Sequence, residues 1–139
     1  MAMPAPQWKP SRLDRQVAKF TRKQARMKSK QAEERKYRAD ETARRKQAFA
    51  REGGRCRATG VPLRLVTDNP LLLAHNHHIV FRSAGGSDEL HNRIIVSPEI
   101  HDLIHRHIVS VEGDGNATVT FTRRSRETGD VERVWESER

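Results

Sequence analysis

The sequence predicts an α+β fold built from three successive parts, and three observations support this division. The stretch from Ser11 to Glu52 contains no proline or glycine and is rich in helix-forming residues. All seven histidines lie between Ala74 and Ile108, in a segment whose pattern indicates strand, loop, strand and helix. Residues 117–136 then form two strand patterns joined by a turn. We therefore expect a long helical arm, a histidine-rich core and a C-terminal β-hairpin.

The predicted N-terminal helix carries the positive charge of the chain. Of the 27 basic and 18 acidic residues, residues 1–52 hold 16 and 6, which gives a net charge of +10; the remainder holds 11 and 12, a net charge of −1. Ser11 is placed to cap the helix, and Asp14 suits its positive end. The densest group of cations consists of Arg22, Lys23, Arg26, Lys28 and Lys30.

Two interpretations of this arm stay open. It is either a solvated, partly disordered tail or weak coiled coil, since Leu13, Val17 and Phe20 follow heptad-like spacing, or a clamp for nucleic acid. Clustered Lys and Arg side chains neutralise phosphates and release counterions, which favours the clamp if the rest of the chain acts on nucleic acid.

The histidine-rich core begins with a predicted pair of strands. His77 and His78 end a short apolar run and stand directly before another. Residues 83–87 form a turn-rich loop, because two of them are glycines that adopt backbone angles other residues avoid. Residues 93–96 are β-branched apart from the first, which is typical of a strand.

A helix is predicted from residue 99 to residue 108. Ser97 is a suitable N-cap, and Pro98 suits the first helical position. His101 and His105 are four residues apart and therefore lie on one face of this helix. Imidazole is a common metal ligand and a common general base near neutral pH, so the segment predicts a metal site with a base beside it.

This segment resembles the HNH endonuclease family, whose core is called ββα-metal or His-Me finger. The resemblance covers roughly residues 56–108. It rests on His77-His78-Ile79, Arg82-Ser83-x-Gly85-Gly86-x-Asp88, Asn92, His101 and His105. It implies a metal-dependent endonuclease that hydrolyses DNA, expected to be double-stranded, with one divalent cation (Mg, Mn, Zn or Ni). Small free-standing members of the family resemble products of phages or mobile elements.

The resemblance assigns a role to each matching residue. His77, His101 and His105 are implied to bind the metal, His78 to act as general base, and Asn92 to brace the loop that orients this base. Three protein ligands leave positions for a phosphate oxygen and water, and the cation acts as a Lewis acid. Adjacent strand residues point to opposite faces, so we expect a strand end or a bulge to re-aim one of the two adjacent histidines.

Other residues carry weaker expectations. Arg82 is a candidate phosphate contact or a surface arginine. His75 is expected to pack beside the site rather than to bind the metal, and His91 and His107 to be structural or exposed. The alternative function is a basic nucleic-acid-binding protein whose HNH-like module is inactive.

One feature of the family is missing from the sequence. Many members bind a structural zinc ion through two cysteine pairs, at the positions that Cys56, Thr59, Ser97 and Ile100 occupy here. Three of the four thiols are absent, so we expect no structural zinc and interpret Cys56 as a small buried residue.

The expected domains are an arm in residues 1–52 and a nuclease domain in residues 53–139, with its core at 74–108. Val119, Phe121 and Trp135 of the hairpin are expected to pack on this core. No apolar run is long enough to cross a membrane, and the first residues lack the features of a signal peptide. A single cysteine excludes a disulfide framework, so a cytoplasmic setting is expected.

Overall fold

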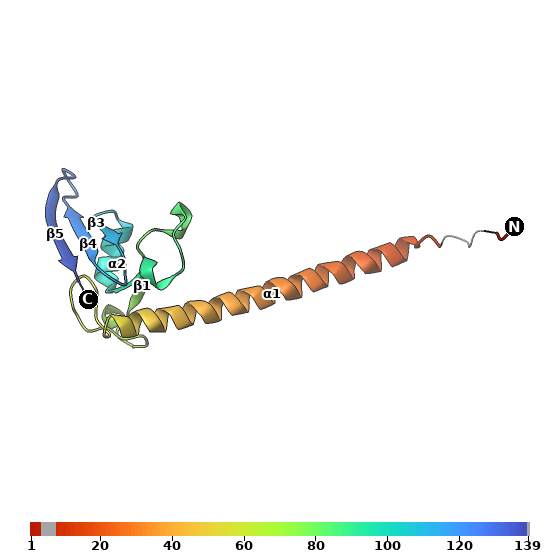
Figure 1. Ribbon diagram of the computed structural model, residues 1–139, viewed down its shortest axis with the longest axis horizontal. Helices are drawn as coiled ribbons and strands as arrows, with labels where there is room; N and C mark the ends of the chain where they lie inside the picture. Colours follow the sequence, from red (N-terminus) through yellow and green to blue (C-terminus); the bar gives the residue numbers. More distant parts are fainter. Residues whose placement is uncertain (4–7, 139) are drawn as a thin grey trace. The chain divides into compact units, whose positions relative to one another are not determined.

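The computed structural model describes residues 1–3 and 8–138 and shows a mixed α+β chain with a long N-terminal helix and antiparallel strands (Figure 1). The chain divides into two compact units, Met1–Asp40 and Glu41–Arg139. No helix in the described ranges is long and apolar enough to cross a membrane.

The first unit consists mainly of the long helix α1 (Arg12–Arg51), which continues into the second unit. Its start is fixed by two reciprocal hydrogen bonds, in which the Asp14 amide donates to Ser11 Oγ (3.1 Å) and the Ser11 amide donates to the Asp14 carboxylate (2.8 Å). These bonds satisfy N–H groups that have no partner within the helix, and they confirm the predicted cap. Every described residue of the first unit is exposed, so this unit forms no core of its own.

Residues 41–51 of α1 belong to the second unit, although the sequence assigned them to the arm. Ala48 is fully buried, the Arg45 guanidinium donates to the carbonyl of Ala74 (2.8 Å), and that of Arg51 donates to the carbonyl of Leu90 (2.7 Å). Composition could not reveal this boundary, because these contacts join residues that are far apart in the sequence.

The predicted strand pair is present. Strand β1 (His75–His78) pairs antiparallel with β2 (Arg93–Val96). In this register His75 lies opposite Val96 and His78 lies opposite Arg93. All four residues of β2 are buried, which is expected of a β-branched strand covered on both faces.

Helix α2 (Pro98–His105) follows β2 at once. Ser97 Oγ accepts a hydrogen bond from the amide of Ile100 (3.4 Å), and proline occupies the first turn, which confirms the predicted start. The helix ends three residues earlier than the sequence predicted. His107 has a positive φ of 57°, and the Ile108 amide bonds the carbonyl of Leu103, so the chain leaves the helix there through a left-handed residue.

The C-terminal part is a three-stranded antiparallel sheet in the order β3-β4-β5 (Figure 1). Its strands are β3 (Val109–Gly113), β4 (Val119–Arg124) and β5 (Val131–Ser137). The predicted hairpin corresponds to β4 and β5. Strand β3 was not predicted, because five residues with one partly buried and one buried valine give a weak pattern.

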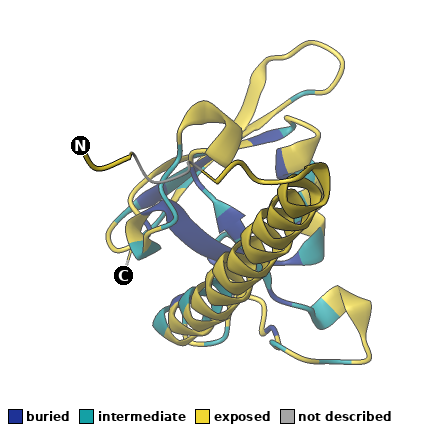
Figure 2. Ribbon diagram, turned by 90° about the vertical axis from the view of Figure 1, so that its right-hand side faces the viewer, coloured by how far each residue is buried: buried dark blue, intermediate teal, exposed yellow. Residues whose placement is uncertain are grey.

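The apolar core joins α2, the two sheets and the end of α1 (Figure 2). Val119 and Phe121 are fully buried, and the rings of Phe121 and Trp135 stack with centroids 5.3 Å apart, as expected for these three residues. The Trp135 indole N–H also donates to the carbonyl of Ala58 (2.9 Å). The buried apolar residues are Ala48, Cys56, Leu63, Ala74, Ile79, Ile94, Ile95, Val96, Ile100, Ile104, Val109, Val119 and Phe121.

The segment from residue 61 to residue 73 pairs through isolated bridges. Arg64 pairs with Leu73, and the 3₁₀ helix η1 (Pro70–Leu72) follows a turn at Asn69. The Asn69 side chain accepts a hydrogen bond from the amide of Leu71 (3.0 Å), which caps this turn.

Candidate metal centre

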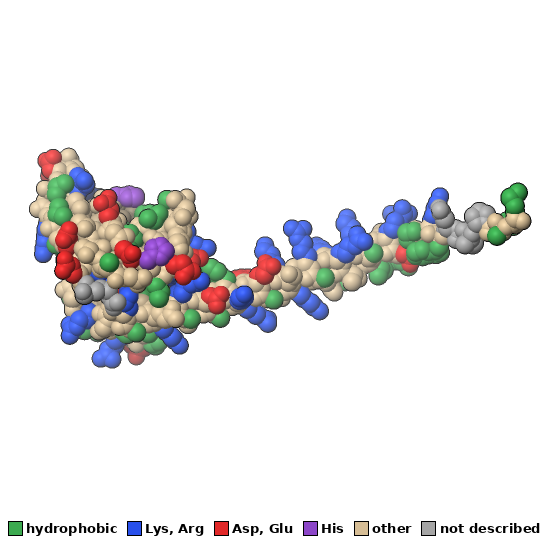
Figure 3. Space-filling model, viewed as in Figure 1, with side chains coloured by type: hydrophobic (Ala, Val, Ile, Leu, Met, Phe, Trp, Pro, Cys, Tyr) green, Lys and Arg blue, Asp and Glu red, His purple; other side chains and the backbone are tan. Residues whose placement is uncertain are grey.

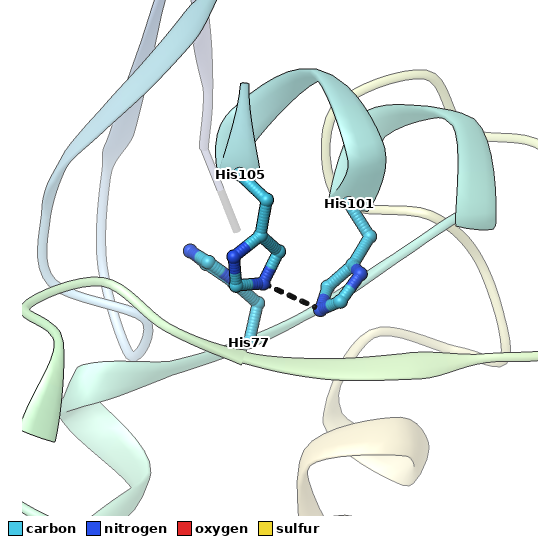
Figure 4. Close-up of side chains that lie close together, drawn as sticks. All are labelled: His77, His101 and His105. Atoms are coloured by element: carbon cyan, nitrogen blue, oxygen red, sulfur yellow. Dashed lines mark hydrogen bonds between the residues drawn. The ribbon is translucent and has the colours of Figure 1, made fainter. Parts of the chain in front are cut away.

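Three imidazoles from two elements converge in the second unit (Figure 4). His77 projects from β1, whereas His101 and His105 project from α2, where their spacing of four residues puts them on one face. One ligand atom of each ring lies within 4.8 Å of those of the other two. The Nε2 atoms of His101 and His105 are 3.1 Å apart. The structure therefore brings together the three residues predicted as metal ligands.

The geometry of this group fits a metal ion. Two nitrogens that each lie 2.0–2.1 Å from one zinc ion, at a tetrahedral or octahedral angle, are separated by about 2.8–3.4 Å. The distance between His101 and His105 falls in this range. His77 Nε2 is buried and has no hydrogen-bond partner among the residues that the structure describes. A buried nitrogen without a partner is costly unless something else binds it, and a cation beside the other two rings would do so.

Two of the three rings are also held in the protonation state that a metal requires. Burial, followed by the nearby rings of His101 and His105, lowers the pKa of His77 from 6.5 to about 4. Burial likewise lowers the pKa of His101, with smaller contributions from His75 and His105. Near neutral pH the lone pairs of His77 and His101 are therefore available, and no proton has to be displaced from them.

The surroundings leave one side of the group open. His77 is buried, His101 is intermediate and His105 is exposed. Phe81 packs edge-on against the ring of His77 (centroids 5.4 Å apart), and His75 packs against the ring of His101 (4.5 Å). Two aromatic neighbours thus flank a group that is open to solvent at His105. The donor set of three imidazoles suits zinc, nickel or manganese better than magnesium.

His78, the predicted general base, does not share the surroundings of His77. The pairing of β1 with β2 continues without a bulge to His78, the last residue of the strand. We expected a strand end or a bulge to re-aim one of the two adjacent histidines, and the structure has the strand end without the bulge. The ring of His77 contacts α2, whereas His78 Nε2 lies 3.0 Å from Oδ1 of Asp88.

Asn92 ties the loop after β1 to the start of β2. Its amide nitrogen donates to the carbonyls of Val80 (2.9 Å) and Ser87 (2.8 Å), and its oxygen accepts from the amide of Val80 (2.8 Å). The side chain is therefore bonded to both ends of the loop, which is the bracing that the resemblance implied. Gly86 fits beneath it, since a Cβ there would lie 1.8 Å from the carbonyl oxygen of Val80.

Three charged residues beside His78 had no role in the sequence prediction. They are Asp88, the fully buried Arg93, and Glu41 from α1. Asp88 belongs to the motif that resembles the HNH family, so the sequence pointed to this residue. Nothing in the sequence pointed to Glu41, because its partner Arg93 is 52 residues away.

The predicted phosphate-binding residues lie in different parts of the chain. Arg82 opens the 3₁₀ helix η2 (Arg82–Ala84), with its side chain 55% exposed and its Nε atom 3.5 Å from Oδ1 of Asp88. The other cations lie on α1 in the first unit, where basic side chains follow much of the helix (Figure 3). The period of 3.6 residues places four of them on one face and the fifth, Lys28, on the opposite face. The four are Arg22, Lys23, Arg26 and Lys30.

The positions of the expected zinc cysteines have other contacts here. Cys56 is buried, as predicted, and its Sγ atom accepts a hydrogen bond from the amide of Ser97 (3.2 Å). Ser97 caps α2, and Ile100 is part of the apolar core. In the described part of the chain, the three histidines are the one group of His, Cys, Asp and Glu placed to hold a metal ion.

Comparison with known proteins gave no match to a family model, to a curated protein or to a solved structure.

Proposed function

We propose that the chain is a metal-dependent HNH endonuclease with a ββα-metal core, which nicks or cuts DNA by hydrolysing phosphodiester bonds. The observation that carries this proposal is the convergence of three imidazoles, one with a buried nitrogen that has no other described partner. The order of the elements supports it, since two adjacent histidines end β1, Asn92 precedes β2, and His101 and His105 lie on α2.

The chemistry assigned to the chain needs few groups. His77, His101 and His105 would hold a divalent cation, which would supply Lewis-acid stabilisation of the phosphoryl oxygens and of the leaving 3′ oxygen. His78 takes a proton from the attacking water. Asn92 holds the loop that follows His78 and so keeps the end of β1 fixed.

DNA is the proposed substrate because of the charge distribution. Residues 1–40 hold 12 basic and 4 acidic residues, a net charge of +8, whereas residues 41–139 hold 15 and 14, a net charge of +1. A helix with this density of cations binds a polyanion by releasing counterions, and double-stranded DNA carries one negative charge for about every 1.7 Å of its axis. Arg82 is the proposed phosphate contact close to the loop.

A plasmid assay tests the proposal. Protein freed of metal with a chelator is incubated with supercoiled plasmid, alone and with magnesium, manganese, nickel or zinc. We expect no cleavage without metal and conversion to nicked or linear plasmid with at least one metal. The His101→Ala variant, prepared in the same way, serves as control against contaminating nucleases.

The alternative function predicts a different result in the same assay. A basic DNA-binding protein with an inactive module would retard plasmid in a gel but leave it supercoiled with every metal. That result would overturn the proposed nuclease activity and leave DNA binding as the function.

A further inference from the structure

The carboxylate of Asp88 makes its closest contact with the proposed base. Its Oδ1 atom lies 3.0 Å from His78 Nε2, 3.3 Å from an Nη atom of Arg93 and 3.5 Å from Nε of Arg82. Arg93 Nε also donates to the backbone carbonyl of Asp88 (2.6 Å). Both the backbone and the side chain of Asp88 are therefore held by Arg93.

Arg93 is itself held by buried contacts. Its side chain is fully buried, and its guanidinium binds both carboxylate oxygens of Glu41, at 2.6 and 2.7 Å. A bidentate pair of this kind fixes the plane of the guanidinium. Arg93 lies directly opposite His78 in the pairing of β1 with β2, so the anchor and the base belong to the same pair of strands.

Asp88 is ionised near neutral pH. Burial favours its neutral form, but the hydrogen bond with His78 and the charges of Arg82 and Arg93 outweigh burial and lower the pKa of Asp88. An ionised carboxylate only accepts hydrogen bonds, so the ring nitrogen facing it must carry a hydrogen. In the neutral imidazole this leaves Nδ1 of His78 with the lone pair.

We propose that Asp88 is a positioning residue for His78, which holds the ring in the Nε2–H tautomer and directs Nδ1 to the attacking water. The role in cleavage rests on the proposed function, whereas the tautomer does not. Glu41 and Arg93 support the pair through a chain of ionic contacts, so a residue of α1 reaches the base through two intervening side chains.

The tautomer is measured first, on the metal-free wild-type chain. Long-range proton–nitrogen NMR on protein with labelled histidine shows which ring nitrogen carries the hydrogen, and His78→Gln identifies the His78 signal. We expect the Nε2–H form in the wild type and loss of this preference in Asp88→Asn. A wild-type His78 with its hydrogen on Nδ1 would overturn the proposal without any variant.

Cleavage kinetics then separate positioning from a structural role. Asp88→Asn should lower kcat on the order of 10- to 100-fold, with KM for plasmid, metal affinity and melting temperature close to the wild type. Asp88→Glu, which restores the charge, should recover part of kcat. Asp68→Asn, an exposed aspartate in another loop, should match the wild type.

Two outcomes would contradict the positioning role. An unchanged kcat in Asp88→Asn would overturn it, and so would a loss of kcat, metal affinity and melting temperature together, since that is the result of a damaged loop. A wild type that shows the Nε2–H form and yet cleaves no DNA with any metal would overturn the proposed function, while the tautomer would still support the pairing of Asp88 with His78.

Discussion

At the scale of single residues, burial changes the protonation of His77. It is 3% exposed, and its pKa falls from 6.5 to about 4. Between these values the unfolded chain binds a proton at His77 and the folded chain does not. Between these two pKa values, falling pH therefore lowers the free energy of unfolding. Above pH 6.5 His77 is neutral in both states and no longer has this effect.

The first prediction concerns acid stability. The metal-free protein should lose stability as pH falls from about 6.5 to about 4, by about 3 kcal/mol for His77 alone at about 1.4 kcal/mol per pH unit. His75 and His101, whose pKa values are also lowered by burial, act in the same direction. Urea unfolding across this range measures the effect. His77→Gln should flatten the slope, and the exposed control His91→Gln should not; equal slopes for all three proteins would contradict the account.

The second prediction concerns the base. His78→Ala should reduce cleavage about 10²–10⁴-fold, the range over which general bases contribute, because water then has no positioned proton acceptor. Metal affinity should stay unchanged, since the rings of His77, His101 and His105 lie together without His78. Single-turnover cleavage and isothermal titration calorimetry measure the two quantities. Near-normal cleavage in this variant would remove His78 from the role of base.

The residues of the metal group could be predicted from the sequence because their signals are local. The spacing of His101 and His105 places them on one helical face, and His77 follows from a motif of two adjacent histidines. The partners of His78 could not be predicted. Arg93 and Glu41 are 52 positions apart, and no periodicity in either segment indicates that they meet.

At the scale of elements, the loop between β1 and β2 depends on a close approach of backbone to backbone. A Cβ on Gly86 would lie 1.8 Å from the carbonyl oxygen of Val80 and 2.9 Å from the amide nitrogen of Asn92. Gly85 has a positive φ of 83° but has no atom within 4 Å of its Cβ position. Gly86 is thus required because a side chain has no space there, whereas Gly85 is favoured only because of its left-handed backbone.

The third prediction uses this pair. Gly86→Ala should destabilise the protein by about 2–4 kcal/mol, because the loop must move and break the bonds of Asn92. Gly85→Ala should destabilise it by about 1 kcal/mol, the effect of a left-handed backbone alone. Urea unfolding measures both variants. A Gly86→Ala variant as stable as Gly85→Ala would show that the Asn92 clamp does not hold the loop in this position.

The elements of the core could be predicted more fully than those around it. The start of α2 follows from Ser97 and Pro98, and β2 follows from its β-branched residues. Strand β3 was missed, because it has only two apolar residues besides its final glycine. The place of residues 41–51 in the second unit was missed, because they have the same composition as the arm before them. Both the pairing of β3 and the place of residues 41–51 depend on contacts between residues far apart in the sequence.

At the scale of the whole molecule, most of the net positive charge and the histidine group occupy different parts of the chain. This separation is predictable from composition, although composition puts the boundary at residue 52 and the compact unit begins at Glu41. A truncation that tests the arm must therefore end before residue 41. Removing residues 1–32 takes away 9 basic residues and 1 acidic residue, and leaves a chain with a net charge of +1.

The fourth prediction concerns this truncation. DNA affinity should fall far more than turnover at saturating DNA, and the slope of log affinity against log salt should decrease by about 0.9 for each phosphate that the arm neutralises. Binding at three salt concentrations and a thermal melt measure these effects. The matched control is a full-length variant in which glutamine replaces Arg22, Lys23, Arg26, Lys28 and Lys30. Its DNA affinity and its salt slope should also decrease. An unchanged salt slope in a well-folded truncation would exclude the clamp.

A titration of cleavage against bound metal shows whether the three histidines hold the catalytic ion. Metal-free protein receives increasing amounts of the metal that supports plasmid cleavage, and bound metal per chain and cleavage rate are determined on the same samples. We expect the rate to rise in proportion to bound metal and to level off at one ion per chain, and we expect His101→Ala and His105→Ala to lower both quantities together. Cleavage without bound metal, or one tightly bound ion per chain without cleavage, would contradict this expectation.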